Sequence, residues 1–139
     1  MHIKVYESLP ADAAMIRSEV FIREQGFLNE FDDIDKRAVH LVAFDGVRAA
    51  ATCRLYRDEH ERETYVIGRI AVIKEYRGKG IGSLILREAE RKIRVLGGIR
   101  AVLLAQKSAE EFYIKQGYGA FGEICYDEFC PHIRMEKSL

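Results

Sequence analysis

The sequence lacks an excess of charge of either sign. Its 139 residues include 22 lysines and arginines against 22 aspartates and glutamates, so the formal net charge is zero. A protein that attracts nucleic acid or anionic lipid through its overall field carries an excess of positive charge. We therefore expect no nucleic-acid or membrane partner, and a phosphorylated ligand would have to be bound by a local site.

Long apolar runs are also missing. No stretch approaches the ~18 residues that a membrane-spanning helix needs, and the opening Met-His-Ile-Lys-Val has no apolar signal region. Cysteine is scarce as well. Cys53, Cys125 and Cys130 cannot all pair within the chain and are too sparse for a secreted disulfide scaffold. These absences predict a soluble cytoplasmic protein with reduced thiols.

The composition that is present, 48% apolar and 32% charged residues, is that of a globular protein. We expect residues 1–139 to form a single domain. The apolar periodicity predicts the order strand, helix, three strands, helix, strand, helix, two strands. This order favours an α+β fold whose helices flank a mixed sheet. A homodimer through the apolar C-terminal strands is compatible with this pattern.

Several segments carry more detailed predictions. Asp45-Gly46 predicts a hairpin, whereas the acidic residues 27–36 predict a surface loop or short irregular helix. Residues 80–96 form the best amphipathic helix, with Glu88–Lys92 and Glu90–Arg94 as i,i+4 pairs. The apolar run 99–105 predicts a central strand covered on both faces. Ser108 is expected to cap the last helix.

The chemistry is concentrated in Arg77-x-x-Gly80-x-Gly82, between a predicted strand and the amphipathic helix. Glycines at positions 78, 80 and 82 allow positive φ and close backbone approach. Free N–H groups at a helix start bind anions, and Arg77 and Lys79 would add positive charge. The segment therefore predicts a phosphate-binding loop.

Two well-known phosphate loops do not fit this segment. A P-loop needs Ser or Thr after Gly-Lys, but Gly80 follows Lys79 here. The dinucleotide fingerprint requires a different glycine spacing and an acidic residue after the next strand, and residues 99–108 contain none. A coenzyme A loop is the remaining interpretation.

Residues 68–96 resemble the central motif of the GNAT superfamily of N-acetyltransferases, in which Arg/Gln-x-x-Gly-x-Gly/Ala follows a strand. Residues 108–118, with Ala109, Phe112-Tyr113 and Gly117-Tyr118, resemble the motif that follows it. The segments Val20–Gln25 and Pro131–Met135, with Asp35 and His40, are similar to the ElaA-like or YjcF-like branch. The resemblance implies a GNAT fold, with a mixed, mostly antiparallel sheet of about six or seven strands. This sheet is splayed in the middle and flanked by three or four helices.

The resemblance also implies acetyl-CoA as cosubstrate and a primary amine, small or peptidic, as acceptor. The backbone of Ile70, Ala71 and Val72 would pair with the pantetheine arm, and a backbone N–H near Val72 would stabilise the oxyanion. Tyr113 would protonate the departing thiolate. The expected coenzyme site comprises Ile70, Ala71, Val72, Arg77, Gly78, Lys79, Gly80, Ile81, Gly82, Ser83, Gln106 and Tyr113.

The group that deprotonates the amine is left open by the sequence. Glu24 is the first candidate, followed by His132 and His40, while Asp32, Asp33 and Asp35 are candidates for binding a cationic amine. Each of them also has an ordinary structural interpretation. Cys125, Cys130 and His132 lack a usual zinc spacing, so we expect no metal.

Two other functions remain open at this point. A non-catalytic acyl-CoA-binding or sensor domain would keep the loop but lose the chemistry, and Tyr113 argues for the enzyme instead. An unrelated ATP- or NAD-binding protein is disfavoured by the failed loop patterns.

Overall fold

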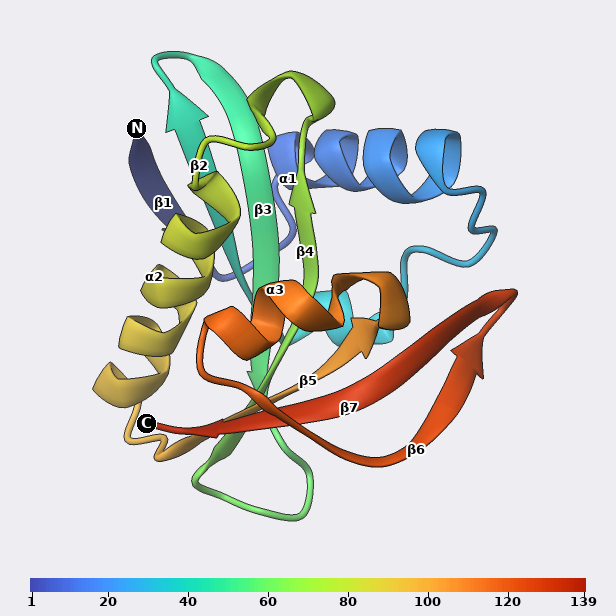
Figure 1. Ribbon diagram of the computed structural model, residues 1–139. Coiled ribbons are helices and arrows are strands. Elements are labelled where there is room, and N and C mark those ends of the chain that lie inside the picture. Colours follow the sequence, from blue (N-terminus) through green and yellow to red (C-terminus); the bar gives the residue numbers. More distant parts are fainter.

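The computed structural model describes residues 1–139, whose elements follow the predicted order (Figure 1). The strands are β1 (His2–Tyr6), β2 (Val39–Asp45), β3 (Arg48–Arg57), β4 (Thr64–Val72), β5 (Arg100–Gln106), β6 (Gly119–Asp127) and β7 (Cys130–Ser138). The α-helices are α1 (Ala11–Arg17), α2 (Ile81–Val95) and α3 (Glu110–Lys115). The π-helix η1 (Ser18–Glu24) continues α1, and short 3-10 turns are η2 (Asp33–Lys36), η3 (Lys74–Tyr76) and η4 (Lys107–Ala109).

The strands form one seven-stranded sheet in the order β1-β2-β3-β4-β5-β7-β6. All neighbours pair antiparallel except β4 and β5, which are parallel. The predicted mixed, mostly antiparallel sheet is therefore confirmed. The predicted hairpin at Asp45-Gly46 joins β2 to β3, with Gly46 at a φ of 61°.

Helices cover both faces of the first half of the sheet. Along β2, Leu41 and Ala43 belong to one apolar cluster, whereas the alternating Val42 and Phe44 belong to another. The first cluster contains the buried face of α2, and the second contains Ala13 and Ile16 of α1. Because successive side chains of a strand point to opposite faces, α1 and α2 lie on opposite sides of the sheet.

The sheet is splayed between β4 and β5. Pairing is limited to Thr64–Val66 against Arg100–Val102, after which the two strands separate. Figure 1 shows β5, β7 and β6 diverging from the direction of β1–β4. This gap is the predicted opening in the middle of the sheet.

A bulge lies in β4 beside the gap. Arg54 pairs with Gly68 but Thr52 pairs with Ala71, so β4 has one residue more than β3 across this interval. Arg69 takes up the extra length with a φ of 53°. A left-handed conformation is disfavoured for a residue with a Cβ, so side-chain contacts are needed to hold it.

Some local predictions were wrong. Glu88 pairs with Arg91 rather than Lys92, and Glu90 is buried, accepting hydrogen bonds from Tyr118 and Lys137. Ser108 does not cap α3. It lies inside η4, and the N-cap position is Ala109.

The prediction that the strand at 99–105 is covered on both faces was also wrong. Ala101, Leu103 and Ala105 are buried, but Leu104 on the other face is 46% exposed. No helix reaches the length and apolar character that crossing a membrane requires.

Candidate active site

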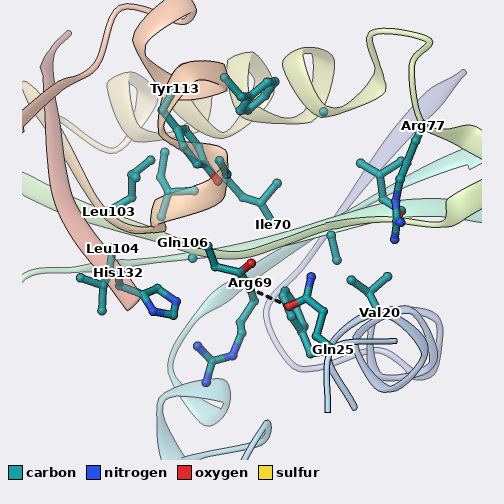
Figure 2. Close-up of a pocket in the computed structure, with 18 of the residues that line it drawn as sticks. Val20, Gln25, Arg69, Ile70, Arg77, Leu103, Leu104, Gln106, Tyr113 and His132 are labelled. Atoms are coloured by element: carbon teal, nitrogen blue, oxygen red, sulfur yellow. Dashed lines mark hydrogen bonds between the residues drawn. The ribbon is translucent and has the colours of Figure 1, made fainter. Parts of the chain in front are cut away.

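A cavity of about 590 Å³ opens where β4 and β5 separate (Figure 2). The lining of this cavity combines β4, β5, the start of α2 and α3 with the segment 20–30 and the β6–β7 hairpin. Its lining residues on these elements are Val20, Phe21, Gln25, Phe27, Asn29, Glu30, residues 67–72, Tyr76, Arg77, Gly78, Gly80, Ile81, Gly82, Ser83, Leu103, Leu104, Gln106, Ala109, Phe112, Tyr113, Asp127 and His132. Of the expected coenzyme site, only Lys79 is outside the lining.

One end of the cavity is the glycine loop. No backbone amide from Gly78 to Ser83 donates to a carbonyl of the protein. Gly78 and Gly80 have φ values of 75° and 77°, and Gly80 is the N-cap of α2. Free amides at the positive end of a helix dipole form an anion site. At Gly82, an added Cβ would lie 3.4 Å from the Phe112 ring.

The charged residues of this loop do not behave alike. Arg77 lines the cavity, but its guanidinium donates to both carboxylate oxygens of Glu24 at 2.9 Å and through Nε to the Val72 carbonyl at 2.9 Å. Lys79 has its Nζ 5.6 Å from the centre of the Tyr76 ring. The free backbone amides, rather than side-chain charge, are thus the main feature of this loop that is suited to an anion.

The β4 backbone beside the gap has free polar groups. Ile73 N–H donates to Ala50 O, so the preceding pair, Val72 with Ala51, is a non-hydrogen-bonded pair of the antiparallel ladder. The N–H and C=O of Val72 therefore point away from β3. The carbonyl is bound by Arg77, and the N–H is left facing the gap.

Tyr113 lies over this strand. It is 9% exposed and packs edge-to-face against Phe112 and Tyr118. Figure 2 shows its hydroxyl pointing toward Ile70. Burial raises the pKa of the Tyr113 phenol, and the buried Cys53 thiol adds to the effect. The group is therefore a proton donor, not a phenolate, at neutral pH.

His132 supplies a basic nitrogen to the same cavity. It lies opposite Gln106 in the β5–β7 ladder and is 6% exposed. Its Nδ1 is 2.9 Å from the Cys130 carbonyl, which can only accept, so Nδ1 carries the hydrogen. In the neutral ring Nε2 then has the free lone pair, and it has no partner within the protein.

The other predicted base candidates are placed differently. Glu24 does not line the cavity, and both of its carboxylate oxygens accept from Arg77. His40 is buried away from the cavity, with Nε2 donating to the Asp35 carbonyl at 3.0 Å. Burial lowers the pKa of His40 more than its contacts with Asp35 raise it. These placements favour structural roles for both residues.

The acidic segment 27–36 contains the predicted short irregular helix, η2, but not all of its acidic side chains lie at the surface. Glu30 and Asp35 are buried. Arg17 donates to Glu30 at 2.8 Å and to Asp35 at 2.7 Å. Arg54 in turn donates to Asp35 at 2.8 Å. Three arginines thus hold this segment, the third being Arg69, which pairs with Glu30 at 2.9 Å.

Asp32 and Asp35 are therefore not free to bind a cationic amine. Asp32 accepts from Arg54 at 2.6 Å, while Asp33 is exposed next to Lys36. Burial tends to raise the pKa of Asp35, but hydrogen bonds from Arg17 and Arg54 outweigh it and lower the pKa to about 2. Burial raises the pKa of Glu30 despite its arginine partners.

Several polar residues that line the cavity were not predicted as site residues. They are Gln25, Asn29, Glu30 and Asp127. Gln106 donates to the Gln25 side chain at 2.7 Å, which joins β5 to the end of η1 (Figure 2). The partners lie 81 residues apart, so no local pattern could indicate the contact. No three His, Cys, Asp or Glu side chains are grouped to hold a metal ion.

Comparison with known proteins identifies the family. Residues 11–139 match the Acetyltransferase (GNAT) domain. The chain belongs to the GNAT acetyltransferase family. Acyl transfer is the general chemistry of this family. YjcF of Bacillus subtilis, an uncharacterized N-acetyltransferase, is 32% identical over 130 residues, covering 91% of this chain and 90% of YjcF.

Solved GNAT structures share the fold. Escherichia coli ElaA superposes with a TM-score of 0.86 at 21% identity, covering 98% of both chains. An acyl-CoA N-acyltransferase from Pseudomonas aeruginosa superposes with a TM-score of 0.85 at 24% identity, also covering 98% of each. The sequence identity to YjcF, and that of 25% over 130 residues to ElaA of Escherichia coli, confirm the predicted resemblance to the ElaA-like or YjcF-like branch.

Proposed function

We propose that this protein is an acetyl-CoA-dependent N-acetyltransferase. The observation that carries the proposal is the unbroken set of free amides from Gly78 to Ser83, which opens into the cavity that Tyr113 lines. The amides and the α2 dipole would bind the pyrophosphate. The pantetheine arm would extend along Ile70–Val72, adding hydrogen bonds to the side of β4 that β5 leaves open.

The proposed reaction is direct transfer. The acceptor amine attacks the thioester carbonyl, forming a C–N bond and a tetrahedral oxyanion that the free N–H of Val72 stabilises. Collapse breaks the C–S bond, and Tyr113 donates its proton to the departing thiolate. The nitrogen of the adduct loses one proton as the amide forms, and the Tyr113 phenolate regains one, so the products are the amide and free coenzyme A. No covalent enzyme intermediate is needed, and the buried Cys53, whose pKa burial raises to about 12, takes no part.

His132 is the proposed base. An amine attacks only in its neutral form, so an ammonium acceptor must lose a proton in the site. The free Nε2 of His132 lies in the cavity lining, whereas Glu24 is engaged by Arg77. The order of candidates is therefore reversed relative to the sequence prediction.

Two measurements test the proposal. Acetyl-CoA, but not ATP or NAD, should raise the melting temperature, because the free amides fit a pyrophosphate on an extended arm. An amine library should then give release of free coenzyme A with at least one acceptor. Binding without release for any amine would support the alternative, a non-catalytic acyl-CoA sensor. If ATP or NAD raised the melting temperature and acetyl-CoA did not, both the acetyltransferase and the sensor hypotheses would be overturned.

A further inference from the structure

Arg69 is positioned in the cavity, near His132 and Gln25, by an unusual backbone. It has a φ of 53° at the β4 bulge, where the pairing with β3 shifts between Thr52 and Arg54. A bulge re-aims a side chain relative to its neighbours, and disfavoured backbone conformations are retained where surrounding contacts hold them. The Arg69 side chain is 23% exposed and lines the cavity.

Most of the Arg69 guanidinium is fixed by contacts to residues 30–32. Its Nε lies 2.9 Å from Glu30 Oε2, and Nη2 donates to the Glu30 carbonyl at 3.1 Å and to Asp32 at 3.4 Å. Nη1 makes no hydrogen bond or ion pair with the protein. In Figure 2 the guanidinium lies between His132 and Gln25, on the far side of Gln106 from Tyr113.

Arg69 shares its acidic neighbours with Arg17 and Arg54, in a cluster of three arginines and three carboxylates (Glu30, Asp32 and Asp35). Glu30 also accepts from Arg17 at 2.8 Å, and Asp32 from Arg54 at 2.6 Å. Each carboxylate is therefore shared between two guanidinium groups. The cavity wall beside Arg69 adds the uncharged amides of Gln25 and Asn29. A guanidinium that is pre-oriented and has Nη1 free of protein partners is suited to an anionic group, and a carboxylate matches its planar donors.

We propose that Arg69 binds a carboxylate of the acceptor, so that the acceptor is an amino acid or a close derivative acetylated on its amine. The assignment rests on the proposed acetyl transfer and deepens it. The amine would lie toward His132, with Asp127 of the β6–β7 hairpin as its counter-charge. Arg69 is then a specificity-determining residue: it contacts the part of the acceptor that does not react.

Matched acceptor pairs test the proposal. Coenzyme A release is measured with three pairs of acceptors, each an amino acid and the amine that lacks its carboxylate. The pairs are leucine with isoamylamine, phenylalanine with phenethylamine, and lysine with cadaverine. The wild type should prefer the amino acid of at least one pair by tenfold or more in kcat/KM. Arg69→Gln should remove this preference mainly through KM, lowering kcat/KM for the amino acid much more than for the decarboxylated amine. Arg69→Lys should keep part of it.

Arg37→Gln is the matched control, because Arg37 is an exposed arginine that pairs with Glu59 outside the cavity. It should behave as the wild type. Acetyl-CoA affinity and the melting temperature of each variant show whether the fold is intact. Two results would overturn the carboxylate site: an equal loss of kcat/KM for both acceptors of every pair in Arg69→Gln, or equal kcat/KM for both acceptors of every pair in the wild type. Neither result would contradict acetyl transfer itself.

The site remains testable if no amine is acetylated. The protein loaded with coenzyme A is then mixed with each amino acid at millimolar concentration, and its melting temperature is measured. A rise that is absent with the decarboxylated partner and absent in Arg69→Gln supports the carboxylate site, although the catalytic proposal has failed. No rise with any amino acid in the wild type overturns it.

Discussion

Glu24 and Arg77 hold each other through two hydrogen bonds of 2.9 Å, although they lie 53 residues apart. The same guanidinium binds the Val72 carbonyl. One side chain thereby joins the end of η1, the end of β4 and the beginning of the glycine loop. Glu24 therefore positions Arg77 and is not available as a free base.

Glu24→Gln tests this interpretation. The pair is partly exposed, and such pairs contribute about 0.2–1 kcal/mol. Its loss should raise the Kd for acetyl-CoA by roughly fivefold or less, with kcat nearly unchanged. Removal of a general base would instead lower kcat by about 10²–10⁴-fold. Steady-state kinetics and calorimetric titration with acetyl-CoA distinguish the positioning role of Glu24 from a general-base role. The control is Glu88→Gln, which removes a carboxylate from an exposed ion pair on α2.

His132→Ala should lower kcat about 10²–10⁴-fold while acetyl-CoA binds nearly as well, because the base acts on the acceptor. Added imidazole should restore part of the rate by replacing the missing ring. The matched control is His40→Ala with imidazole, since His40 is buried outside the cavity. Rescue of His40→Ala, or full activity in His132→Ala, would remove His132 from the base role.

Tyr113→Phe should lower kcat with little change in the Kd for acetyl-CoA, since the ring and its packing are kept and only the proton donor is lost. Because burial raises the pKa of Tyr113, the donor stays protonated to a higher pH than an ordinary tyrosine. The rate should therefore show no alkaline loss near pH ~10, where a free phenol ionises. Turnover in Tyr113→Phe equal to that of the wild type would contradict the acid role.

Gly80→Asp should abolish acetyl-CoA binding, because a carboxylate at the N-cap of α2 would repel the pyrophosphate. Gly46→Asp is a close control. Both glycines have positive φ, 77° and 61°, and neither has an atom within 4 Å of an added Cβ. The backbone strain is therefore similar, but Gly46 lies in the β2–β3 hairpin. Titration calorimetry should show loss of binding for Gly80→Asp alone.

Asp35 should make the protein sensitive to acid. Its pKa is about 2 in the folded protein, below the ~3.9 of an unfolded aspartate. Its stabilising contribution is therefore complete above pH ~4 and is lost as the pH falls toward ~2. Asp35→Asn should flatten this part of the pH profile of the melting temperature. It should also destabilise the protein by about 3–5 kcal/mol at pH 7, because Arg17 and Arg54 lose a buried partner.

The parts of the fold that sequence patterns predicted are those with local signals. The Asp45-Gly46 turn and the stripe of α2 each lie within a short stretch of chain. The glycine loop also depends on neighbouring residues alone, so its place between β4 and α2 could be inferred. The motif around Tyr113 was recognisable for the same reason.

The parts that could not be predicted depend on contacts between distant segments. Arg17 reaches Asp35 across 18 residues, and Arg54 reaches it across 19. Charged residues at 30–35 look solvated unless these partners are known. Glu90 likewise fits a surface helix pair by its spacing. In the fold, however, Tyr118 from the turn after α3 and Lys137 from β7 both bind its carboxylate. Pairing choices of this kind are decided by packing.

The short junction of β4 and β5 has a consequence for how the protein avoids unwanted pairing. Beyond Val66 and Val102 both strands are edge strands, with backbone groups that no neighbour satisfies. Edge strands normally lie at the outside of a sheet, where they are open to other chains. Here two edges face each other inside the molecule, with α2 and α3 at the gap. To pair with either edge, another chain would have to enter the cavity between them.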